Sequence, residues 1–176
     1  MTQHMSKMAT VLDLQDMMIK VGRKEMKMSD VGRAVCEAMV NAWHDGITLV
    51  LRLANATPDF MLELNVKDVL PTEIWTAANL TPGCKLTDAH KGMIKTAKLD
   101  PKKFRMADGF HICFTSCFSM NDWKEFMRGK MPMGAVQPVQ VCRSHQQVAD
   151  VMRLGVEVEA NLDDALSEMD RLADML

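Results

Sequence analysis

Two stretches near the start of the chain carry apolar residues at helical spacing, every three or four positions. The first predicts an amphipathic helix over residues 10–27, and the second predicts a helix that Ser29 caps and Gly46 ends. The apolar positions of the first helix are Val11, Leu14, Met18 and Val21. Those of the second helix are Val31, Val35, Met39 and Ala42.

Apolar and polar residues alternate in the next two stretches, 47–53 and 60–66, a pattern typical of strands with one buried face. A loop that contains Pro58 separates them, so we expect two strands joined as a β-hairpin. Short helices then follow, one opened by Pro71 and one capped by Thr87 that runs to about Lys98.

Strands and helices alternate from residue 110 onward. A strand over 110–118 precedes a helix with a Ser119–Asp122 capping signal, in which we expect Trp123, Phe126 and Met127 to be buried. A second strand over 136–142 precedes a helix that begins at Ser144, and the chain ends in a helix over 161–176. This order predicts parallel strand pairing with right-handed crossovers.

These elements lead us to expect one α+β or α/β domain that spans residues 1–176. Its parts would be two N-terminal helices, a β-hairpin and a C-terminal βαβα unit, all on one mixed sheet. A chain of 176 residues is long enough to bury one core and short for two independent domains.

Composition points to an ordinary globular protein, with 48% hydrophobic residues, 25% charged residues and a net charge of -2. No apolar run reaches the roughly 18 residues needed to span a bilayer, and residues 1–8 lack the apolar core of a signal peptide. We therefore expect a cytoplasmic protein whose five cysteines are reduced, with no membrane partner. Eighteen methionines make the chain methionine-rich, and methionine suits both irregular cores and adaptable binding surfaces.

Charge is unevenly distributed along the chain. Residues 85–105 carry seven Lys or Arg against two acids, whereas residues 146–176 carry eight acids against two Arg. Such segregation can orient a protein partner or a second copy of the chain. The basic stretch matches no nucleic-acid-binding motif and holds only Phe104 as a possible stacking ring, so the sequence argues against nucleic acid as a partner.

Two strand-like runs end in a cysteine that is followed, two residues later, by a serine able to cap a helix. They give Cys117 with Ser119 and Cys142 with Ser144. A thiol just ahead of a helix N-terminus is activated by the helix dipole. The carboxyl ends of parallel strands meet at one edge of a sheet, so both thiols could lie there together with His145.

The run Val141-Cys142-Arg143-Ser144 resembles the active-site loop of rhodanese-type sulfurtransferases. The resemblance implies a persulfide carried by Cys142, and Ser144 and His145 would assist that thiol. If the two strands are neighbours, Cys117, Cys142 and His145 also form a candidate three-ligand metal set.

For function, we expect a non-catalytic protein that binds a partner protein or assembles with itself through Met-rich apolar faces and segregated charge. The alternative is a cysteine-dependent enzyme centred on Cys142, with His145 and Ser144 as helpers. We expect no cofactor, because the chain has neither a Gly-x-x-x-x-Gly-Lys loop nor a Gly-x-Gly-x-x-Gly turn.

Overall fold

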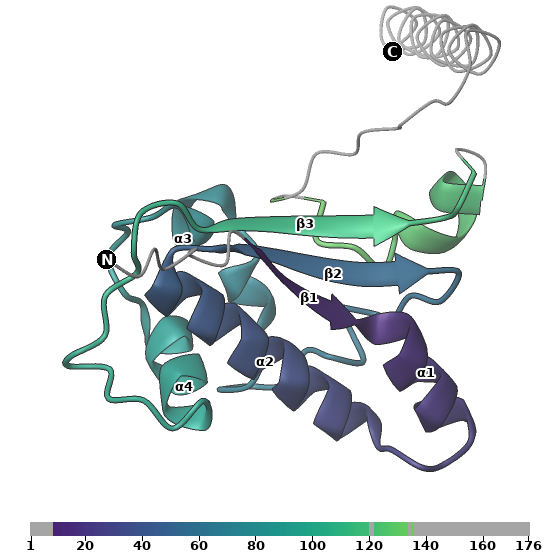
Figure 1. Cartoon of the computed structure of the whole chain (residues 1–176), viewed down its shortest axis with the longest axis horizontal. Coiled ribbons are helices and arrows are strands. Elements are labelled where there is room, and N and C mark those ends of the chain that lie inside the picture. Colours follow the sequence, from purple (N-terminus) through teal and green to yellow (C-terminus); the bar gives the residue numbers. More distant parts are fainter. Residues whose placement is uncertain (1–8, 120–121, 134, 136–176) are drawn as a thin grey trace, which may run out of the picture. The chain divides into compact units, whose positions relative to one another are not determined.

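The protein combines helices with a small parallel sheet, which confirms a mixed α and β fold (Figure 1). The structure, a computed structural model, describes residues 9–119, 122–133 and 135. Its elements in chain order are β1 (Ala9–Asp13), α1 (Leu14–Gly22), α2 (Met28–Asp45), β2 (Thr48–Ala54), the 3₁₀ turn η1 (Thr72–Ile74), α3 (Ala77–Leu80), α4 (Asp88–Thr96), β3 (His111–Ser116) and the π-helical segment η2 (Trp123–Met127). The second strand of the expected βαβα unit and the helices after it lie outside the described residues, and the prediction of one domain over 1–176 remains a prediction.

The sheet has the strand order β1-β2-β3, and both pairs are parallel. Thr48 of the central strand pairs with Ala9 on one side and with His111 on the other. The carboxyl ends of all three strands therefore lie at one edge of the sheet.

The helix expected over residues 10–27 begins later and ends earlier than its apolar spacing suggests. Residues 9–13 form strand β1, and the Asp13 side chain caps α1 by accepting the N–H of Asp16 at 3.1 Å. The helix then ends at Gly22. The predicted beginning of this helix was wrong, because Thr10 and Leu12 also fit a strand. Pairing with β2 decides between the two conformations.

The predicted hairpin is also wrong, because residues 60–66 form a series of turns rather than a strand. The carboxylate of Asp59 accepts the N–H groups of Met61 at 2.9 Å and Leu62 at 2.8 Å, which replaces strand pairing. Phe60 and Leu64 are buried, whereas Leu62 is 76% exposed. Among the described residues the sheet is thus entirely parallel and has no hairpin.

Helix α2 matches its predicted apolar face, since Val31, Val35, Met39 and Ala42 are all fully buried. The predicted cap is wrong, because the helix begins at Met28 and Ser29 lies within its first turn, where the Asp30 carboxylate accepts the N–H of Lys27 at 3.2 Å. The helix ends at Gly46, which adopts a left-handed conformation with φ of 64°. A side chain there would clash, because a Cβ on Gly46 would overlap the carbonyl oxygen of Asp108. Glycine at this position therefore lets the end of α2 touch the chain that enters β3.

The remaining described elements follow the predicted caps. Thr87 caps α4, and Pro71 precedes the η1 turn. Strand β3 falls within the predicted 110–118, with Ile112 and Phe114 facing the core and His111, Cys113 and Thr115 exposed.

The core lies between the sheet and α2, with α4 packed against α2. Its methionines are Met39, Met93, Met106, Met127 and Met131. Every other described methionine is partly buried, so within this part of the chain methionine fills the interior instead of forming an exposed surface.

Candidate interaction surface

One face of the sheet is left uncovered by the described elements. Its side chains form three rows across the strands, which we call the open face: Ala9, Thr48 and His111; Val11, Val50 and Cys113; Asp13, Arg52 and Thr115. Six of these nine residues are exposed and none is buried. The alternate residues Leu49, Leu51 and Leu53 of β2 are fully buried, with α2 against their side of the sheet (Figure 1).

An uncovered face is unusual for a parallel sheet, since such sheets are ordinarily covered on both faces. The central row is apolar, and Val11 in it is 62% exposed. This row gives the open face a hydrophobic centre.

Charge on the open face is already paired. A guanidinium N–H of Arg52 donates to Asp13 at 2.6 Å. The pKa of Asp13 is lowered from its ordinary value, first by the N–H of Asp16 and then by the adjacent Arg52. The Asp13 carboxyl is therefore ionised at neutral pH, and its pairing with Arg52 balances the charge near the carboxyl edge of the open face.

The structure places Cys117 as predicted, directly after β3 at the carboxyl edge of the sheet. Cys117 is exposed, and its backbone N–H donates to the carbonyl oxygen of Ala54 at 3.0 Å. Cys142, Ser144 and His145 lie outside the described residues. The thiol site and the metal set that they would complete with Cys117 therefore remain predictions. Within the described part of the chain, no three His, Cys, Asp or Glu side chains lie close enough together to hold a metal ion.

Ser119 has a structural role that accounts for its position. Its hydroxyl lies 2.7 Å from the carboxylate of Asp122 and accepts the N–H of that residue at 3.2 Å, as the capping signal predicts. The following segment η2 buries Met127, but Phe126 is 49% exposed, which corrects the prediction that it is buried. The five-residue η2 is too short to provide a strong dipole for thiol activation.

Two other described cysteines, Cys36 and Cys84, are poor nucleophiles. Burial raises the pKa of the Cys36 thiol to about 12, and the thiol lies 3.6 Å from the carbonyl oxygen of Met93. Burial also raises the pKa of Cys84. Cys36 is best understood as a small core residue.

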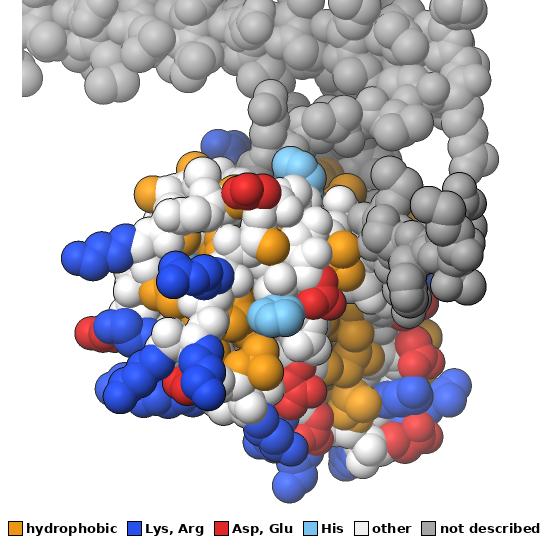
Figure 2. All heavy atoms as spheres, turned by 60° about the vertical axis from the view of Figure 1, so that its left-hand side comes forward, with side chains coloured by type: hydrophobic (Ala, Val, Ile, Leu, Met, Phe, Trp, Pro, Cys, Tyr) orange, Lys and Arg blue, Asp and Glu red, His pale blue; other side chains and the backbone are white. Residues whose placement is uncertain are grey.

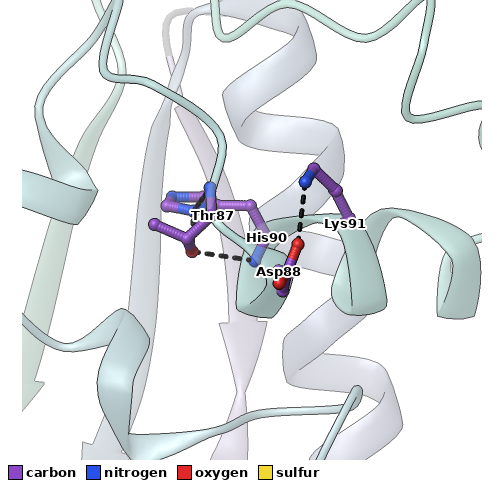
Figure 3. A network of polar contacts seen from close by, with 4 residues as sticks. All are labelled: Thr87, Asp88, His90 and Lys91. Atoms are coloured by element: carbon purple, nitrogen blue, oxygen red, sulfur yellow. Dashed lines mark hydrogen bonds and ion pairs between the residues drawn. The ribbon is translucent and has the colours of Figure 1, made fainter.

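Sequence reasoning missed His90, the only polar or charged residue whose side chain is wholly buried among the described residues. Its Nε2–H donates to the carbonyl oxygen of Asn79 at 2.9 Å. Its Nδ1 accepts the N–H of Thr87 at 3.1 Å, and Figure 3 shows Thr87 beside the ring. Burial lowers its pKa, which favours the neutral ring. The available signal was its place three residues after the cap Thr87, where a capping box usually has Glu or Gln.

His90 is thus a structural residue, because both ring nitrogens are occupied by the backbone. The centroid of its ring lies 5.4 Å from that of the Trp43 ring, and this contact links α4 to α2. Beside it on the surface, Lys91 and Asp88 form an ion pair at 2.8 Å (Figure 3).

None of the helices in the described part of the chain is both long and apolar enough to cross a membrane. No family model matches the sequence, and neither a curated protein nor a solved structure matches it.

Proposed function

We propose that this protein is non-catalytic and acts by self-association, with a second copy covering the open face. The observation that supports the proposal is the side of the parallel sheet that no described element covers, where Val11 lies 62% exposed in an apolar row. Covering this row would remove apolar surface from water, which is the main driving force for association.

The charges of the open face favour a second copy as the partner. In a two-fold dimer the same patch faces itself, so an excess of one charge would repel its counterpart. Asp13 and Arg52 form their own ion pair at 2.6 Å and avoid this penalty. Two such sheets could stack face to face with their apolar rows at the centre.

Light scattering of the full-length protein across a concentration series tests this proposal. We expect wild type to dimerise and Val11→Asp to dissociate at least about tenfold more readily, because a buried carboxylate without a partner is costly. Leu62→Asp is the matched control, since Leu62 is also an exposed aliphatic residue but lies in a turn outside the sheet. A wild type that stays monomeric, or a Val11→Asp dimer as stable as that of wild type, would contradict the proposal.

Cross-linking gives a second test that does not depend on a destabilising substitution. Cys113 is exposed in the apolar row, so a bismaleimide with a flexible spacer should join two copies through it. We expect the cross-linked dimer to disappear in Cys113→Ser and to persist in Cys117→Ser. Cross-linking that does not require Cys113 would place the contact elsewhere and rule out the open face.

A further inference from the structure

A second surface, separate from the open face, is strongly basic. It comprises α4, the residues just before it and the connection from α4 to β3. The basic surface consists of Lys85, Lys91, Lys95, Lys98, Lys102, Lys103 and Arg105, all of them exposed. In Figure 2, Lys and Arg side chains gather on one side of the view, with few acidic side chains among them.

Buried apolar residues hold these cations outward. Met93 and Ile94 of α4 are fully buried, and Phe104 and Met106 of the following connection are 6% and 7% exposed. Because apolar anchors alternate with the basic residues along both segments, the cations are fixed on the solvent side.

Few of these cations are neutralised by described neighbours. Lys91 pairs with Asp88, whereas the other six make no ion pair with another described residue. Asp100 lies within the same connection, and its carboxylate accepts the N–H of Lys102 at 2.9 Å. Among the described residues, this surface therefore carries an excess of positive charge, which attracts an anionic partner.

An open hollow of about 540 Å³ adjoins the basic surface. Lys67, Lys91 and Lys95 line it, together with Gly92 and Thr96 and the carboxylates of Asp68 and Asp88. Lys91 and Lys95 are one helical turn apart on α4, so about 6 Å of helix axis separates them. Lys67 thus extends the line of cations beyond α4.

We propose that the basic surface binds the phosphate backbone of nucleic acid without reading its sequence. Spaced, solvent-exposed lysines suit a chain of phosphates, and such contacts require no motif for base recognition. Phe104, the one ring that the sequence offered for stacking on bases, is instead packed in the core. Its burial removes the stacking contact and leaves the phosphates as the groups that the surface can bind.

The test is fluorescence anisotropy of a labelled 25-base-pair DNA duplex with the full-length protein, measured from 50 to 200 mM salt. We expect binding that weakens about a hundredfold over this range, as for roughly four phosphate contacts. The double variant Lys95→Glu/Lys98→Glu should lose at least about tenfold in affinity and show a smaller salt dependence.

The matched control is Lys24→Glu/Lys27→Glu, which changes the net charge equally but alters exposed lysines between α1 and α2. We expect its affinity for DNA to be much closer to that of wild type than the affinity of Lys95→Glu/Lys98→Glu is. Absence of binding at 50 mM salt, or equal losses in the two double variants, would overturn the proposal. Competition by poly-glutamate as effective as that by unlabelled DNA would also overturn it, in favour of an acidic protein surface as the partner.

Discussion

At the scale of single residues, His90 has the clearest physical consequence. Its ring is fully buried and bridges Asn79 and Thr87, so it is held in the neutral form with its pKa below the ordinary value of about 6.5. In the unfolded chain the ring regains its ordinary pKa. Below about pH 6.5 the unfolded state therefore takes up a proton that the folded state resists. The free energy of unfolding therefore decreases as the pH is lowered.

Replacing His90 should lower stability at neutral pH and weaken its acid dependence. We expect His90→Gln to reduce the free energy of unfolding at pH 7.5 by about 1–3 kcal/mol, because buried hydrogen bonds are lost. The difference in stability between pH 7.5 and pH 5.5 should shrink relative to wild type. Urea unfolding at the two pH values measures both effects.

His44→Gln serves as the control for that experiment, since His44 lies exposed at the end of α2. It should retain most of the difference between the two pH values. A His90→Gln variant with an unchanged acid dependence would show that other groups cause it.

At the scale of elements, close backbone contacts decide which residues the fold accepts. Gly46→Ala should destabilise the protein by roughly 2–4 kcal/mol, because alanine disfavours φ of 64° and its Cβ would meet the carbonyl of Asp108. Gly22→Ala is the control, as nothing lies within 4 Å of a Cβ at that position in α1. It should be neutral or stabilising by up to about 1 kcal/mol. Denaturant midpoints compare the stability of the two variants. Equal losses of stability would show that the contact between position 46 and Asp108 is not the cause.

Features set by nearby residues could be predicted from the sequence. Gly46 as a helix stop and Thr87 as a cap depend on the conformation of one turn, and both are confirmed. Strand β1 could not be predicted, because it depends on pairing with β2, which is distant in sequence. The turns over 60–66 were missed for another reason: the residues alternate as in a strand, whereas Asp59 and a contact with Lys130 hold them in turns. Leu12 becomes a strand residue through β2, and Phe60 is fixed when its N–H donates to the carbonyl of Lys130 at 3.0 Å.

The open face and the basic surface likewise combine features that the sequence predicts with features that only the structure reveals. Along β3, His111, Cys113 and Thr115 alternate with Ile112 and Phe114, a strand pattern already visible in the sequence, and in the structure they share an exposed side. That no described element covers this side could not be predicted, because it depends on the pairing of three strands and on the position of α2. Likewise, the run of charge over 85–105 was evident, but the burial of Phe104 within it required the structure.

At the scale of the whole molecule, the prediction of one domain over residues 1–176 can be tested with two probes. All three tryptophans, Trp43, Trp75 and Trp123, lie in the described part of the chain, so their fluorescence reports on that part alone. Far-ultraviolet circular dichroism reports on helices throughout the chain. We expect the two urea unfolding curves to coincide, as they do for a single cooperative unit. A second transition seen only by circular dichroism would indicate two independently stable parts.

The parallel pairing of the strands also affects how quickly the protein can fold. Ala9 must find Thr48, and Thr48 must find His111, each across a long intervening segment. Closing such loops costs entropy before the contacts repay it, so folding should be slower than that of a helical bundle of similar length. Until β3 joins β2, the leucines of the central strand stay incompletely covered, and the nascent chain is at its most vulnerable to aggregation in that interval.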